Sequence, residues 1–472
     1  MNNELWRLSA TQLAEGYRSG AYTPVDALDA CLARAEACQP ALNAMVFIDR
    51  AGARNAAEES RARWISGTPV GPLDGIPVSV KDNLHVAGQP TRWGSRLLQE
   101  FVPKHDELPV ARLRAAGAVL FGKTNLPEFA MQGYTSNDVS GTTRNPWDLS
   151  LTPGGSSGGA AAAVASGCGP LALATDGGGS IRRPASHCGV IGFKPSAGLV
   201  PRKNGLPEIF LDFEVAGCIG RELGDVQNLM QVLSATPMTA PPPRAARILY
   251  VPRFDGQAVD SGIATQTENA AKQFENLGHR VIEAPSFDIA RQINLLWPNL
   301  SAAGLAWMFA DSSRFPELGL APGQSPDISL CGDAAQAALR LGLNLKTAAL
   351  FDLMTAVQIL KRKVDDLFTR HDFILTPATA ALPWPAQLSH PQEIAGQPAG
   401  PRGHAVFTAL ANAAGLPAIA LPCGFAGNLP TGFQLIGRAG ADASLLALAR
   451  QYEQAHPWKN WPAINTDMEI RQ

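Results

Sequence analysis

The chain has 472 residues, of which 46% are hydrophobic and 17% are charged, and its 39 basic residues nearly balance its 41 acidic ones. This composition supplies enough apolar surface for a large core and excludes a disordered chain. The balanced charge gives no reason to expect nucleic acid or an anionic membrane surface as a partner. We therefore expect one domain over residues 1–472 that acts on a small molecule.

Two absences narrow the setting. The N-terminal residues lack the basic-then-apolar order of a secretory signal, and no run of about 18 apolar residues could span a bilayer. The seven cysteines are scattered without the short pairs that bind zinc or exchange disulfides. We predict a cytoplasmic protein with buried thiols, no metal and no other cofactor. Cys188 is the one thiol near a candidate site, but no histidine is placed to activate it.

Residues 1–68 predict a helical layer at the start of the chain. Ser9 and Gln12 form a capping box, Leu8 and Leu13 are placed as a hydrophobic staple, and Gly20 is a stop signal. Pro24 suits the first position of a second helix, which we expect to end at Pro40.

Short β-branched runs and dense glycine over residues 70–220 predict a core of buried strands linked by tight turns, with strands at 76–80 and 118–121. After a proline-rich crossing at 240–243, a second α/β segment covers 245–472, with strands at 248–251, 373–375 and 418–421. The less patterned stretch 285–345 is helical in texture. Its large apolar residues either pack in the core or line an acyl pocket: Trp297, Trp307, Met308 and Phe309.

Residues 117–124, Gly-Ala-Val-Leu-Phe-Gly-Lys-Thr, formally match a phosphate-binding P-loop. A working P-loop follows a strand and is flexible between its glycines, so that backbone N–H groups can surround a phosphate. The four intervening residues here are apolar and strand-forming. We therefore interpret this segment as a buried strand that ends in a turn.

The densest chemical signal is a pair of serine-bearing glycine loops, Thr-Pro-Gly-Gly-Ser-Ser-Gly-Gly-Ala at 152–160 and Ala-Thr-Asp-Gly-Gly-Gly-Ser-Ile-Arg-Arg-Pro-Ala at 174–185. Glycine lets backbone approach a substrate, and successive N–H groups can stabilise an anion. Ser180, directly after three glycines, could attack a carbonyl whose developing oxyanion those groups hold. The eight histidines are scattered, so no pattern indicates a histidine triad. Lys81, after the apolar run 76–80, is a candidate base, although the residues alone leave its role open.

The stretch 154–196 resembles the amidase signature family. The likeness extends to Gly-Ile-Pro-Val-Ser-Val-Lys-Asp at 75–82, Gly-Lys-Thr-Asn at 122–125, Arg-Asn-Pro-Trp at 144–147, Gly-Phe-Lys-Pro at 192–195, Leu-Thr-Pro at 375–377 and Gly-Leu-Pro-Ala at 415–418. The resemblance implies an α/β/α fold with a central mixed sheet. It also implies a catalytic triad of Lys81 as base, Ser156 as cis-peptide proton shuttle and Ser180 as nucleophile.

The same resemblance assigns the substrate-facing backbone. It places the oxyanion loop at Gly177, Gly178, Gly179 and the N–H of Ser180, and a further substrate contact near Ala130 and Met131. Two positions depart from the family pattern. Gly177 replaces a larger residue and could widen the pocket, while the family's Gly-Leu-Lys-Pro-Thr is Gly-Phe-Lys-Pro-Ser here.

The neighbouring polar residues are expected to support these loops. We predict that Ser157, Thr175, Asp176 and Arg182 hold the loops by hydrogen bonds, that Asp82 orients the Lys81 region, and that Lys123 is structural.

The main functional prediction is a free-standing amidase that cleaves a small carboxylic amide, including aryl or apolar acylamides, through a seryl acyl-enzyme. The alternative is the glutaminase component of a tRNA-dependent amidotransferase, which passes ammonia to a partner. The residues after Pro195 lack the Gly-Arg-Val-Ser-Arg-Tyr-Gly pattern that we associate with that component. A catalytically inactive binding protein is a third option, which the retention of Lys81, Ser156 and Ser180 argues against. A homodimer is left open.

Overall fold

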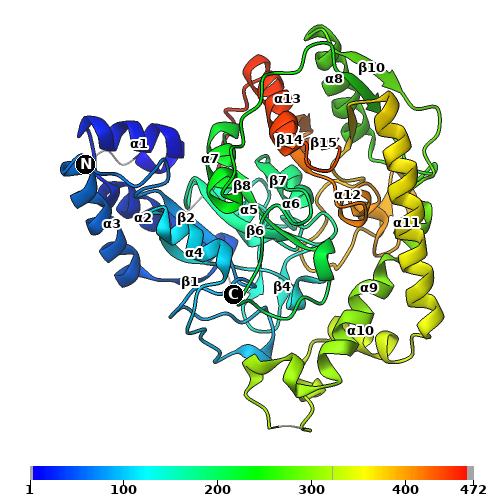
Figure 1. The fold of residues 1–472 in the computed structure, drawn as a ribbon, viewed down its shortest axis with the longest axis horizontal. Helices are drawn as coiled ribbons and strands as arrows, with labels where there is room; N and C mark the ends of the chain where they lie inside the picture. Colours follow the sequence, from blue (N-terminus) through cyan, green and yellow to red (C-terminus); the bar gives the residue numbers. More distant parts are fainter. Residues whose placement is uncertain (1–3, 322, 465–472) are drawn as a thin grey trace.

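A mixed sheet of 11 strands runs through the centre of the computed structural model, which describes residues 4–321 and 323–464 (Figure 1). Neighbouring strands are parallel in β3–β2–β6 and in β11–β9–β10, and the other pairs are antiparallel. In sheet order the strands are β1 (Met45–Ile48), β3 (Val119–Thr124), β2 (Pro77–Lys81), β6 (Leu171–Asp176), β8 (Val215–Gly220), β7 (Ile191–Lys194), β14 (Ala418–Ala426), β15 (Leu429–Gly437), β11 (Phe373–Pro377), β9 (Arg247–Tyr250) and β10 (Arg280–Glu283). The predicted fold class is confirmed.

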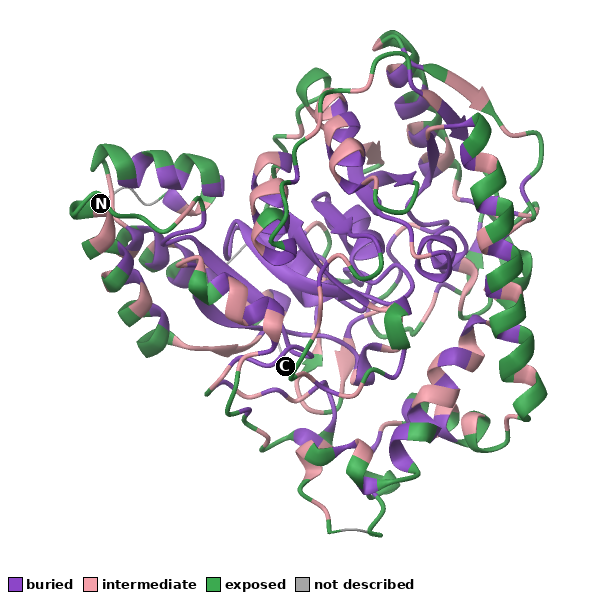
Figure 2. Cartoon of the chain, viewed as in Figure 1, coloured by how far each residue is buried: buried purple, intermediate pink, exposed green. Residues whose placement is uncertain are grey.

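Helices cover both faces of this sheet, because both faces of its central strands are apolar. In β6, Leu171 and Leu173 pack into one core cluster while Ala172 and Ala174 pack into another, as the two-residue period of a strand requires. Figure 2 shows the sheet as the buried centre, with exposed residues on the outer surfaces of the helices.

The helices divide between the two faces by the clusters they join. One face carries α1 (Ala10–Ser19), α4 (Leu108–Ala115), α7 (Leu223–Ser234), α8 (Ser261–Asn276) and α13 (Asp442–Ala455). The other carries α2 (Pro24–Leu42), α3 (Arg50–Ile65), α5 (Gly158–Ala165), α6 (Arg182–Cys188), α9 (Arg291–Phe309), α10 (Asp333–Leu343), α11 (Thr347–Arg370) and α12 (Ala409–Ala413). The catalytic loops lie on this second face, where α5 and α6 begin.

The N-terminal helices begin where the sequence predicts. Ser9 and Gln12 form the capping box of α1, and Gly20 ends that helix in the left-handed conformation. The predicted end of α2 at Pro40 is wrong, because the helix continues to Leu42. A proline this close to the end removes only one helical hydrogen bond, and the N–H of Asn43 still donates to Gln39 at 2.8 Å.

The segment that matches a P-loop pattern is a buried strand. All six residues of β3 are buried, and the strand extends through Lys123 and Thr124 instead of turning after Phe121. Lys123 pairs with Asp82 at 3.0 Å and donates to the hydroxyl of Thr91 at 2.9 Å. The lysine is therefore held inside the protein, and no flexible loop separates the two glycines.

The stretch 285–345 folds mainly into α9 and α10, as its texture predicts. Met308 and Phe309 are core residues, which fits the first of the two predicted roles. Trp307 fits neither role, since 47% of its surface is exposed and the Arg314 guanidinium lies over its ring. Trp297, on the same helix, reaches the cavity described below.

Over residues 4–321 and 323–464, no single helix is both long and apolar enough to cross a membrane. By length and composition alone, one pair bent by 100° passes that test, Asp333–Leu343 with Thr347–Arg370.

Candidate active site

Lys81 is the last residue of β2, and its side chain is completely buried. Because β2 is parallel to β6, the side chain reaches the end of the neighbouring strand. Its Nζ lies 2.8 Å from the hydroxyl of Ser156, 3.0 Å from the hydroxyl of Thr175 and 3.4 Å from the carbonyl oxygen of Thr175. Burial lowers the pKa of Lys81 from 10.5 to about 7, although Glu214 and Asp176 act in the opposite direction.

Ser156 and Ser157 form the tight turn that leads into α5. The peptide bond between Gly155 and Ser156 is cis. The N–H of Ser157 donates to the carbonyl oxygen of Ser180 at 3.1 Å, and its hydroxyl donates to the carbonyl oxygen of Thr175 at 3.1 Å. The two serine-bearing loops, which are separate in sequence, are thus joined directly beside Lys81.

Ser180 ends the glycine loop that connects β6 to α6. Gly179 has a φ of 107°, and a Cβ there would lie 2.3 Å from the hydroxyl of Thr408, so this position requires glycine. Its N–H donates to Asp176 at 2.7 Å. The N–H groups of Gly178 and Ser180 are used by none of the hydrogen bonds found in the described parts of the chain, which leaves them available to a ligand.

A buried ion pair fixes the glycine loop from behind. The carboxylate of Asp176 accepts two hydrogen bonds from Arg182, at 2.9 and 3.0 Å, and one from the N–H of Ile181 at 3.1 Å. Asn412 donates to it as well, at 3.0 Å. Burial alone would raise the pKa of Asp176, but Arg182, Lys194 and Asn412 hold it well below its usual range. The carboxylate therefore stays ionised and keeps the loop in one shape.

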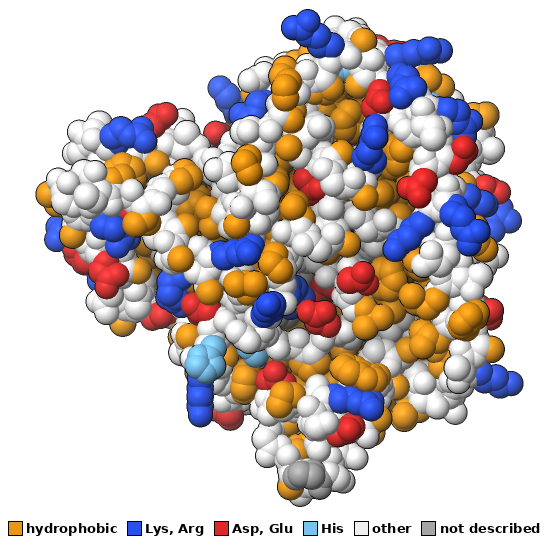
Figure 3. Space-filling model, viewed as in Figure 1, with side chains coloured by type: hydrophobic (Ala, Val, Ile, Leu, Met, Phe, Trp, Pro, Cys, Tyr) orange, Lys and Arg blue, Asp and Glu red, His pale blue; other side chains and the backbone are white. Residues whose placement is uncertain are grey.

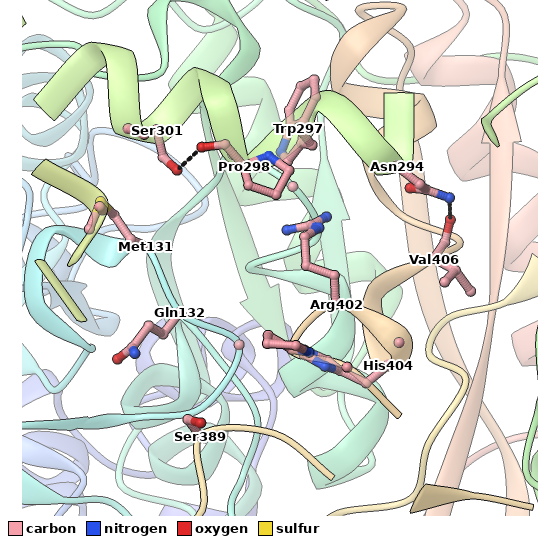
Figure 4. Close-up of a pocket in the computed structure, with 18 of the residues that line it drawn as sticks. Met131, Gln132, Asn294, Trp297, Pro298, Ser301, Ser389, Arg402, His404 and Val406 are labelled. Atoms are coloured by element: carbon pink, nitrogen blue, oxygen red, sulfur yellow. Dashed lines mark hydrogen bonds between the residues drawn. The ribbon is translucent and has the colours of Figure 1, made fainter. Parts of the chain in front are cut away.

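A cavity of about 1020 Å³ opens in front of Ser180. The backbone of the glycine loop and the turn at Ala130 and Met131 form one side of it, and α9 and α10 form another. Figure 4 shows Trp297, Pro298 and Ser301 of α9 opposite Met131 and Gln132. Most of the α9–α10 wall is apolar: Leu295, Trp297, Pro298, Ala334, Ala337, Ala338 and Leu341.

The structure brings together nearly all the residues that the sequence singles out. Ser180, Gly177, Gly178, Ala130 and Met131 all line the cavity. Lys81 and Ser156 are completely buried behind it. Gly179 differs from the prediction: it does not line the cavity, and its N–H is engaged by Asp176.

The supporting residues act much as expected, with one correction. Ser157, Thr175, Asp176 and Arg182 do hold the loops by hydrogen bonds. Asp82 does not bond to Lys81: its carboxylate pairs with Lys123 and accepts from the N–H of Arg92. The reason is geometric, since Asp82 lies in the turn after β2, where its N–H donates to the carbonyl oxygen of Thr124 at 3.1 Å and its side chain reaches the neighbouring Lys123 of β3.

Several residues of the site carry no sequence signal. Arg183 donates to the carbonyl oxygens of Gly178 and Gly155, at 2.7 and 3.2 Å, and so braces both catalytic loops. Asn412 and Thr408 reach the loop from more than two hundred positions further along the chain. Arg402 and His404 enter the cavity wall from a loop without any motif. Only a three-dimensional structure could place them.

A resident metal ion would find no ligand set in the part of the chain that the structure describes, where no group of three His, Cys, Asp or Glu side chains is suitably arranged. Cys188 is buried, and burial raises the pKa of its thiol well above the usual range. The thiol therefore stays protonated and does not form the nucleophilic thiolate.

Comparison with known families decides the class. The family model described as Amidase matches residues 26–446. The chain belongs to the amidase signature family. It is accordingly an enzyme of the amidase class, which hydrolyses carbon–nitrogen bonds of amides.

Solved structures agree on the fold. A bacterial aryl acylamidase of the amidase signature family superposes with a TM-score of 0.87 at 26% identity, covering 98% of this chain and 99% of the other. The 6-aminohexanoate cyclic dimer hydrolase superposes with a TM-score of 0.86, also at 26% identity and with the same coverage.

Curated relatives are more similar in sequence. The glutamyl-tRNA(Gln) amidotransferase A subunit of Symbiobacterium thermophilum is 34% identical, over 95% of this chain and 96% of its own. The protein of the same name from Roseiflexus sp. is 35% identical, over 96% and 97%. These names support the predicted alternative, the amidotransferase component, better than the main prediction of a free-standing amidase.

Proposed function

We propose that this amidase signature enzyme cleaves a small carboxylic amide through an acyl-enzyme on Ser180. The hydroxyl of Ser180 attacks the amide carbonyl and loses its proton through Ser156 to Lys81. The N–H groups of Gly178 and Ser180 stabilise the oxyanion that forms on the former carbonyl oxygen. The proton then returns to the leaving nitrogen, which departs as amine or ammonia. Water cleaves the resulting ester by the same relay and releases the carboxylate.

The hydrogen-bond pattern of Lys81 is the observation that carries this proposal. A neutral amine has two N–H donors and one lone pair. Its three contacts fit that inventory if the hydroxyl and carbonyl of Thr175 accept the two protons and the lone pair accepts from Ser156. The lowered pKa of Lys81, about 7, supports a neutral amine at working pH. The buried lysine is then poised to take a proton from one serine only.

The shape of the cavity favours an apolar acyl or aryl group. The α9–α10 wall is largely aliphatic and aromatic, and such a wall favours apolar groups by excluding water. Gly177 adds space, since the atoms nearest to a Cβ there would belong to Phe210 and Glu214, at an ordinary contact distance of 3.5 Å. A panel of amides with acyl groups of increasing size, compared by kcat/KM, tests this. Preference for the smallest acyl groups would contradict the assignment.

The curated relatives favour a second candidate, the glutaminase component of a tRNA-dependent amidotransferase. The two candidates share the chemistry and differ in the substrate and in the dependence on partner proteins. Ammonia release from glutamine by the purified chain, measured alone and with partner proteins, separates them. Glutaminase activity that requires the partners, together with no turnover of apolar amides, would replace the first candidate by the second.

A further inference from the structure

The cavity contains a positive charge that the protein does not neutralise. Arg402 lines the cavity, and in Figure 4 its side chain extends between His404 and the α9 residues Trp297 and Pro298. Within the described residues its guanidinium makes no hydrogen bond, and two of its nitrogens, Nε and Nη2, are buried without a partner. A buried donor left without an acceptor is costly, and a charged one more so.

The surroundings of Arg402 add no compensating acid. Burial lowers its pKa to about 10, and no carboxylate among the described residues opposes that effect. The nearby Arg183 repels it: burial and the charge of Arg402 lower the pKa of Arg183 to about 9. His404 is buried, and desolvation followed by the charges of Arg183 and Arg402 holds its pKa well below 6.5, so the ring stays neutral. Arg402 thus faces the cavity as a cation next to a second cation.

A third cation of the cavity, Arg291, is already neutralised by an acid. Arg291 also lines the cavity, but it pairs with Asp255 at 3.3 Å. Among the lining residues that the structure describes, Asp255 is the one acid, so Arg183 and Arg402 have no matching carboxylate there. Arg183 donates from its two terminal nitrogens to Gly178, Gly155 and Thr408, and only its Nε is buried without a partner. Arg402 makes no hydrogen bond within the described residues, so it is the cation with the most donors left to bind a ligand.

We propose that Arg402 is a specificity residue that binds a carboxylate on the substrate, at the end of the acyl group opposite the scissile amide. This rests on the proposed function, and it narrows the substrate class to half-amides of dicarboxylic acids with an apolar spacer. The guanidinium and a carboxylate match as a planar donor–acceptor pair. The spacer contacts the α9–α10 wall, while the amide carbonyl lies at Ser180.

Matched substrates test the proposal. Half-amides of succinic, glutaric, adipic and suberic acid are compared with the corresponding diamides, which have nearly the same shape and no charge. We expect wild-type kcat/KM to be at least about tenfold higher for the best half-amide than for its diamide. A hydrogen bond to a charged group contributes enough free energy to account for a tenfold ratio. Arg402→Gln should abolish this ratio, and Arg402→Lys should retain part of it because the charge remains. Arg362→Gln is the control: it removes an exposed arginine of α11 that does not line the cavity, and should leave the ratio unchanged.

A binding measurement separates failure of this proposal from failure of the proposed function. In the Ser180→Ala background, calorimetric titration with the best half-amide should show affinity at least about tenfold weaker when Arg402→Gln is added. If wild type hydrolyses no amide but the titration shows this loss, the proposed function fails and the carboxylate site stands. If diamides are cleaved as well as half-amides, or if Arg402→Gln changes neither ratio nor affinity, the carboxylate site is wrong and the amidase proposal is unaffected.

Discussion

The charge on Lys81 gives the sharpest test of the proton relay. Lowering its pKa from 10.5 to about 7 corresponds to about 5 kcal/mol of free energy against the protonated amine. With that pKa, about one tenth of the enzyme has a neutral lysine at pH 6 and about nine tenths at pH 8. The acylation rate should therefore rise about tenfold over this interval and then level off. An unshifted lysine would instead give about a hundredfold rise over the same interval and no plateau.

Single-turnover acylation of an amide with a chromogenic leaving group, followed from pH 5 to 10, measures this curve without interference from product release. Lys81→Arg should lose both the limb and most of the rate, because guanidinium does not release a proton in this range. A Lys81→Arg enzyme with near-normal acylation would refute the relay. So would a wild-type rate that is flat between about pH 6 and 9 while chemistry limits turnover.

Protein stability provides a second measurement that does not depend on turnover. Because the folded pKa of Lys81 lies below the unfolded one, the unfolded chain binds more protons between pH 7 and 10.5. This residue therefore destabilises the fold fully below about pH 7, and the penalty disappears as the pH rises to about 10.5. Lys81→Met removes this penalty, so its free energy of unfolding relative to wild type should be highest near pH 7. Denaturant unfolding of both proteins should show this difference shrinking as the pH rises to about 10.5. A pH-independent difference would contradict the lowered pKa.

Four further substitutions have defined outcomes. Ser180→Ala should keep its folded circular dichroism spectrum but lose fluorophosphonate labelling and at least about a thousandfold in kcat. Ser156→Ala should slow acylation by about 10²- to 10⁴-fold with little change in the binding of a substrate analogue, and a normal single-turnover rate would exclude the shuttle role. Gly177→Ile should lower kcat/KM for bulky acyl groups by about tenfold relative to small ones, and an equal loss for both would show that the side chain does not narrow the pocket. Asp176→Asn should cost about 3–5 kcal/mol of unfolding free energy, because Arg182 would be left as an unpaired buried charge, and a loss below about 1 kcal/mol would remove the loop-bracing role.

The two serine-bearing glycine loops could be located in the sequence because their shape depends on local rules, whereas the catalytic roles of their serines came from the resemblance to the family. Gly179 needs a positive φ and has no room for a side chain, and the turn at Ser156 likewise lies in a glycine-rich stretch. Such conformational requirements select several glycines within a few residues, which is a pattern that can be recognised in the sequence. The sheet was predictable for a related reason: buried strands such as 76–80 require apolar side chains on both faces. Pro40 shows the limit of local rules, since a single lost hydrogen bond near a helix end does not stop the helix.

Pairings between distant segments were not predictable in the same way. Asn412 bonds to Asp176, and Thr408 to the backbone of Gly178, yet neither side chain stands in a recognisable motif. Asp82 pairs with Lys123 of β3 and not with the adjacent Lys81, and no local pattern shows that β3 lies beside β2. Trp307 has a large apolar side chain of the kind found in cores, yet it lies at the surface. Which face of a helix is buried depends on the elements that pack against the helix.

The chemistry and the specificity of this enzyme come from separate parts of the chain. The proposed bond-breaking groups are Lys81, Ser156 and Ser180. Lys81 is hydrogen-bonded to Ser156 at 2.8 Å, and the N–H of Ser157 donates to the carbonyl oxygen of Ser180 at 3.1 Å. The cavity wall comes from α9, α10 and the loop at Arg402, where hydrophobic side chains also gather on the outer surface (Figure 3). Substitutions in that wall change the volume or charge offered to the acyl group, and those that do not touch the glycine loop, as Trp297 does at Gly178, leave the proposed catalytic groups in place. This separation explains how proteins with one fold can bear names as different as aryl acylamidase, cyclic dimer hydrolase and tRNA amidotransferase. If Arg402 binds a substrate carboxylate as proposed, the substrate is selected by residues that similarity to the catalytic motifs does not reveal.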